Sequence, residues 1–101
     1  MNAIYDGAMS DSHTVETLLG TVTEIPAAVI LEQNRNHTRA LARQAVIAHL
    51  RLRLNWTVTR TAEALNRNHA TISYSVAHFR NLLEVNDREA VKMWNILEAT
   101  L

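Results

Sequence analysis

The residues best suited to specific recognition chemistry lie at positions 61–76, in the sequence TAEALNRNHATISYSV. One short helical pattern stops at Asn66, and a second begins within two or three residues. Asn68, His69 and Thr71 fall in the first turn of the second pattern, where their side chains can donate and accept hydrogen bonds. Two helices joined by so short a turn are typical of a helix-turn-helix, whose second helix enters the major groove of DNA.

The spacing of apolar residues in the second helix separates a buried face from an open one. The positions that we expect to be buried are Ile72, Val76, Phe79 and Leu83. The positions that we expect to face outward are His69, Ala70, Ser73 and Tyr74. Because Ala70 and Ser73 are small, this outward face can approach a partner closely.

The first helix of the motif is predicted to follow Thr57, whose hydroxyl can cap it. Val58, Thr61, Ala62 and Leu65 would form its inner face. Asn66 can take the left-handed conformation that a tight turn needs, and Asn68 can cap the second helix. Each junction of the motif therefore has a residue suited to it.

Charge is unevenly distributed along this chain of zero net charge. Residues 1–32 carry five acidic residues and no basic one, and residues 83–101 are weakly acidic. Residues 33–82 carry a single acidic residue, Glu63, and a basic block of eight arginines: Arg35, Arg39, Arg43, Arg51, Arg53, Arg60, Arg67 and Arg80. Charged helix faces are often simply solvated, but a basic block beside a helix-turn-helix favours a phosphate-bearing partner.

The remaining sequence predicts an all-α fold, a single-domain bundle of about five to six helices over residues 11–101. Glycine occurs only at positions 7 and 20 and proline only at position 26. We expect residues 1–10 to form a flexible tail, with Met9 as an alternative natural start. A first helix would be capped by Asp11 or Ser12, with Gly20 weakening or ending it, and its apolar stripe is Val15, Leu18, Leu19 and Val22.

Three further helices complete the expected bundle. A short helix covers IPAAVILEQ at 25–33, and a turn follows over Gln33 to Asn36. The longest helix runs from about Thr38 to Leu54, and its predicted core positions are Leu41, Ala45, Ile47, Ala48, Leu50, Leu52 and Leu54. A last helix, capped by Asn86, would pack Ala90, Trp94, Leu97 and Leu101 on the core, with Trp56 and Trp94 as anchors.

Several classes of site are not indicated by the sequence. The chain has no cysteine, no histidine pair at helical zinc-ligand spacing, no Ser-His-carboxylate cluster and no glycine-rich phosphate loop. It also has no long apolar run or signal peptide. We therefore expect no enzyme activity, metal, cofactor, small-molecule substrate or membrane association, and a cytoplasmic, nucleoid-associated protein.

Two blocks of the sequence, ARQAVIAHL at 42–50 and TAEALNRNHATI at 61–72, resemble the C-terminal DNA-binding domain of the bacterial replication initiator DnaA. The resemblance covers roughly residues 11–101, without the initiator's ATPase domain. It implies binding to double-stranded DNA, with Arg35 in the minor groove and Asn68, His69 and Ala70 facing bases. The residues that would hold phosphates are Arg43, Gln44, Arg51 and Thr71, and we add Arg67 of the basic block and the outward-facing Ser73 to the candidate interface.

The sequence departs from the family at the residues that would read bases. Asparagine stands at position 68 where aspartate is usual, alanine stands at position 70 where threonine is usual, and the turn is one residue shorter. Asparagine can pair with adenine and the Ala70 methyl group can touch thymine, so we expect an altered target site.

Two functions remain open from the sequence. The first is a stand-alone, sequence-specific DNA-binding domain that acts in replication control or transcription regulation, with a replication or transcription protein as a further candidate partner. The second is a protein-interaction adaptor that has kept the fold and lost DNA binding, docking through its acidic N-terminal segment or the apolar outer residues of the last helix.

Overall fold

The computed structural model describes the backbone of residues 7–23 and 35–100, and side chains within 11–23 and 37–100. It contains the helices α1 (Gly7–Thr23), α3 (Arg35–Leu52), α4 (Val58–Leu65), α5 (His69–Glu84) and α6 (Arg88–Thr100). The described residues form no strand, so the predicted all-α fold is confirmed. None of these helices combines the length and the apolar character that a membrane crossing requires.

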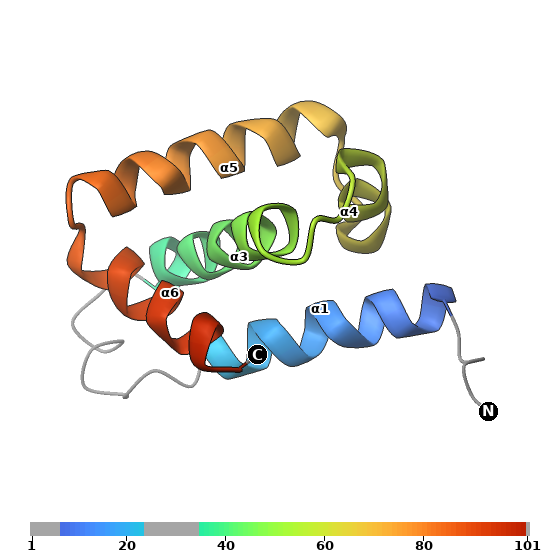
Figure 1. The fold of residues 1–101 in the computed structure, drawn as a ribbon, viewed down its shortest axis with the longest axis horizontal. Helices are drawn as coiled ribbons and strands as arrows, with labels where there is room; N and C mark the ends of the chain where they lie inside the picture. Colours follow the sequence, from blue (N-terminus) through green and yellow to red (C-terminus); the bar gives the residue numbers. More distant parts are fainter. Residues whose placement is uncertain (1–6, 24–34, 101) are drawn as a thin grey trace.

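Helix α3 runs through the middle of the bundle (Figure 1). Helices α1 and α5 lie on opposite sides of it, α4 lies beside its C-terminal end, and α6 packs against α1, α3 and α5. This central position explains why most of α3 is buried. The core consists mainly of Val15, Leu18 and Val22 from α1, Leu41, Ala42, Ala45, Val46, Ala48 and Leu50 from α3, Phe79 from α5, and Ala90, Met93 and Leu97 from α6.

The helix-turn-helix consists of α4, the turn at residues 66–68, and α5. Thr57 caps α4 by accepting a hydrogen bond from the backbone N–H of Arg60 at 3.0 Å. Asn68 caps α5 in the same way, accepting from the backbone N–H of Thr71 at 2.7 Å. The predicted caps are therefore confirmed. The two helices pack on α3 through a small second core of Ile47, Ala62 and Ile72.

Asparagine, rather than glycine, ends three of the helices. Asn55, Asn66 and Asn86 follow α3, α4 and α5 with φ of 58°, 55° and 58°. After α4, the N–H groups of Asn66 and Arg67 return to the carbonyl groups of Glu63 and Ala62 at 3.3 and 2.9 Å. This pattern is a Schellman motif, and it uses carbonyl groups that the helix end would otherwise leave without donors.

The ends of two helices differ from the prediction. Helix α1 begins at Gly7, so residues 7–10 of the expected tail are helical and Asp11 is not a cap; the helix continues through Gly20 to Thr23. Helix α3 begins at Arg35, within the expected turn, and ends at Leu52 rather than Leu54. The predicted helix at 25–33 lies outside the described residues, as do Gln33 and Leu101.

The predicted core is correct except at a few positions. Leu52 is 39% exposed because it lies in the last turn of α3, whereas His49, one turn earlier, is fully buried against α6. On α5, Ile72 and Phe79 are buried as expected, but the small Ser75 is buried between them and Val76 and Leu83 are only half-buried. Trp56 is buried and Trp94 packs on the core while half-buried.

The cap of α6 was predicted at the wrong residue. Asn86 takes the left-handed conformation that closes α5. Asp87 caps α6 instead, its carboxylate accepting a hydrogen bond from the backbone N–H of Ala90 at 3.1 Å. An asparagine next to an aspartate suits either role, and local sequence alone does not decide between them.

Candidate nucleic-acid interface

The outward side of α5 carries the residues predicted to meet bases. His69, Ala70, Ser73 and Tyr74 are exposed, as the periodicity predicted. Asn68 is exposed directly before the helix, and Thr71, whose backbone N–H donates to the Asn68 cap, is half-buried. The first two turns of α5 therefore present short polar and small side chains that allow close approach by a double helix.

Two contacts hold side chains on this face. The Nε2 atom of His69 lies 3.5 Å from the Thr59 hydroxyl of α4, at the outer limit for a hydrogen bond. One turn further along, the Tyr74 ring stacks on the His78 ring with centroids 5.5 Å apart and planes 10° apart. Both His69 and Tyr74 remain exposed while they make these contacts.

Helix α3 contributes a polar flank beside the motif. Ile47 packs against Ala62 and Ile72, and it marks the side of α3 that faces the helix-turn-helix. Each residue of a helix advances by about 100°, so Arg43, Gln44 and Arg51 all lie within about 60° of Ile47. The flank therefore places predicted phosphate contacts next to α4 and α5.

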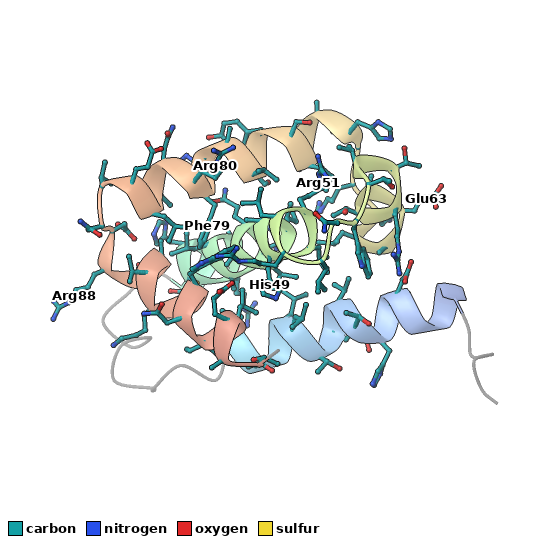
Figure 2. The ribbon with its side chains drawn as sticks, viewed as in Figure 1. His49, Arg51, Glu63, Phe79, Arg80 and Arg88 are labelled. Carbon is teal, nitrogen blue, oxygen red and sulfur yellow. The ribbon has the colours of Figure 1, made fainter. Side chains whose placement is uncertain are left out.

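Gln44 and Arg51 are both half-buried, and so less accessible to a phosphate than the sequence suggested. Gln44 lies in the wall of a hollow of about 320 Å³ between α3 and α5. Arg51 lies at the end of α3 near α4 (Figure 2) and donates a hydrogen bond of 2.7 Å to the carbonyl oxygen of Trp56. This hydrogen bond ties Arg51 to the connection between α3 and α4. A phosphate contact by the remaining N–H donors of Arg51 stays a prediction.

Two arginines of the basic block form ion pairs with acidic residues far away in the sequence. Arg53 donates to Glu98 at 2.7 Å. Arg60 forms two hydrogen bonds with Asp11, at 2.9 and 2.7 Å, and its guanidinium lies 3.9 Å from the centre of the Trp56 ring. The Arg60 hydrogen bond lowers the pKa of Asp11. These pairs neutralise part of the basic block.

Four other arginines of the block remain unneutralised. Among the described residues, no ion pair or hydrogen bond engages the guanidinium group of Arg39, Arg43, Arg67 or Arg80. Arg43 is half-buried on the flank of α3, and the other three are exposed. An arginine with five free donors suits the oxygen atoms of a phosphate.

The sequence prediction of the site omitted three residues that the structure places beside it. Arg39 precedes Arg43 by one turn on α3. Arg80 is an exposed residue of α5 (Figure 2), and its spacing of 11 residues from His69 places the two about 20° apart around the helix. Tyr74 was predicted to face outward without being assigned a contact. Their helical spacing from assigned residues is the signal that could have identified them. Arg35 is the first residue of α3, and its side chain lies outside the described part.

Other kinds of site have little support in the described residues. No group of three or more histidine, aspartate or glutamate side chains is placed there to hold a metal ion. A second hollow, of about 420 Å³, lies along the outer side of α6 and is lined mainly by apolar atoms of Val91, Ile96 and Ala99. It lies on a different helix from the interface described above.

Comparisons with protein-family models, curated proteins and solved structures found no match to the chain.

Proposed function

We propose that the chain is a sequence-specific binder of double-stranded DNA, with α5 as its recognition helix. The observation that carries the proposal is the combination of an exposed, short-side-chain face at the start of α5 and unneutralised arginines beside it. Phosphate contacts supply most of the affinity in such complexes, and base contacts supply the specificity.

The resemblance to the DNA-binding domain of DnaA supports the same proposal and assigns roles within it. By the resemblance, Asn68, His69 and Ala70 would meet the bases, and the phosphate contacts would be Arg43, Gln44, Arg51 and Thr71. We add exposed Ser73 and Arg67 to this interface. Control of replication or of transcription, at the nucleoid, is the biological role that such an interface suits. The proposed activity is binding rather than catalysis.

A comparison of two arginines, Arg43 on α3 and Arg53 directly after its end, tests the proposal. Arg43 has no ion-pair partner among the described residues, whereas Arg53 is paired with Glu98. We expect Arg43→Ala to weaken binding to every duplex and to lower the slope of log affinity against log salt by about one. Arg53→Ala, the matched control, should leave that slope unchanged. The measurement is fluorescence anisotropy of a labelled duplex over a series of salt concentrations.

Either of two results would count against the proposal. One is the absence of duplex binding at moderate salt, and the other is an equal change of slope in both variants. The second result would mean that arginines contribute only through overall charge.

The alternative is a protein-interaction adaptor, and the hollow on the outer side of α6 is the observation that favours it. Exposed Arg88 and Lys92 border this apolar surface, which would suit a partner with apolar and acidic residues. An adaptor would not bind duplex DNA at moderate salt, and the substitution Arg35→Ala would not change its affinity for the protein partner. Because α5 takes no part in this surface, variants of α5 separate the two functions.

A further inference from the structure

The orientation of the Asn68 side chain is determined by the cap that it provides. The backbone N–H of Thr71 points at this side chain across 2.7 Å. A backbone N–H can only donate, so the atom that faces it must be the carboxamide oxygen, Oδ1. In the planar carboxamide the nitrogen lies on the other side of the carbon, so Nδ2 is directed away from the first turn of α5.

This orientation leaves Asn68 as a donor toward any partner in front of α5. Asn68 is exposed, and no described residue accepts a hydrogen bond from Nδ2. Its two N–H groups can therefore meet only acceptors. In the major groove, guanine presents two neighbouring acceptors, N7 and O6, and can therefore engage both N–H groups. Adenine and thymine present one acceptor each, N7 and O4, and cytosine presents the donor N4.

We propose that Asn68 selects guanine at one position of the DNA site; this inference rests on the proposed function. Pairing with adenine through both Oδ1 and Nδ2 would require the two atoms to face the same base edge. The carboxamide would then have to turn away from Thr71 and give up the cap. The cap thus favours guanine over the adenine that asparagine can otherwise read.

The substitution Asn68→Asp tests this inference with little change in shape. Aspartate caps helices as well as asparagine does, and its charge suits a helix N-terminus, so α5 should form normally. Its outer oxygen accepts instead of donating, and acceptors read the N4 amino group of cytosine. We expect selection from a random duplex library to give guanine at one position with the unchanged protein, and cytosine there with Asn68→Asp, with the preference for guanine reduced about fivefold or more.

Asn68→Ser is the control for the cap. Its hydroxyl can still accept from Thr71, but the carboxamide donors are gone, so we expect the same position to lose its preference without turning to cytosine. Circular dichroism of all three proteins should show equal helix content. The base preference is the readout, because the added charge of Asn68→Asp lowers affinity for any DNA.

The outcomes separate this inference from the proposed function. A motif that is identical for the unchanged protein and Asn68→Asp would overturn the guanine assignment while leaving DNA binding in place. A preference of the unchanged protein for cytosine, adenine or thymine at the responding position would overturn it as well. If the unchanged protein enriches no motif, the proposed function fails and the assignment fails with it.

Discussion

His49 is a polar residue inside the core, on the side of α3 that meets α6 (Figure 2). Its ring is fully buried, stands edge-on to Trp94 with centroids 5.6 Å apart, and has no hydrogen-bond partner on either nitrogen among the described atoms. The charged groups nearby are Glu98, 4.0 Å from Nδ1, and Arg53, which holds Glu98. Burial lowers the pKa of His49 from its ordinary value of 6.5, and Glu98 opposes this only in part.

The lowered pKa of His49 predicts a loss of stability in acid. The unfolded chain takes up a proton on this residue as the pH falls through 6.5, while the folded chain does so only at lower pH. The free energy of unfolding should therefore decrease below pH 6.5, by no more than about 1.4 kcal/mol per pH unit from this group. Urea denaturation at several pH values measures the effect.

A variant without the imidazole provides the control for this pH dependence. His49→Leu places an apolar side chain of similar volume in the core, and this side chain cannot take up a proton. Its unfolding free energy should depend less on pH between 7 and 5 than that of the unchanged protein. If the two pH profiles coincide, His49 does not resist protonation in the folded state.

At the scale of elements, the turns between helices depend on asparagines in a left-handed conformation. The chain has two glycines, both within α1, so none is available at the ends of α3, α4 and α5. Asparagine adopts this conformation more readily than other residues with a side chain. The turn that Asn66 forms sets the angle at which α5 leaves α4, so the presentation of the candidate interface depends on it.

Substitution of Asn66 tests this role. Asn66→Ala should lower the free energy of unfolding by about 1 kcal/mol, because alanine is strained at positive φ. Asn66→Gly should cause no comparable loss, because glycine is not strained there. Asn81→Ala, at an exposed site within α5, should also be tolerated. Thermal unfolding followed by circular dichroism compares the stability of the three variants. An equal loss of stability in Asn66→Ala and Asn66→Gly would refute the explanation.

Much of the architecture was predictable from local patterns. The boundaries of α4 and α5, their caps at Thr57 and Asn68, and the outward face of α5 all follow from spacing and from residue types. The start of α1 and the cap of α6 were wrong because several neighbouring residues suit each role. His49 was missed as a core residue because its burial depends on where α6 packs.

At the scale of the whole molecule, the sequence showed the basic block but not which of its arginines are neutralised. The partners of Arg60 and Arg53 lie 49 and 45 residues away in the chain, in α1 and α6. Only the packing of these helices brings the charges together. Zero net charge therefore coexists with unneutralised arginines around the helix-turn-helix, a distribution that suits binding to DNA.

The most direct test of the central claim is selection from a random duplex library at near-physiological salt, with the unchanged protein and with His69→Ala. The account predicts an enriched motif for the unchanged protein. It also predicts that His69→Ala loses discrimination at one position, worth roughly 1 to 3 kcal/mol, while binding other sequences with similar affinity. No enrichment, or an equal loss on every sequence, would contradict it.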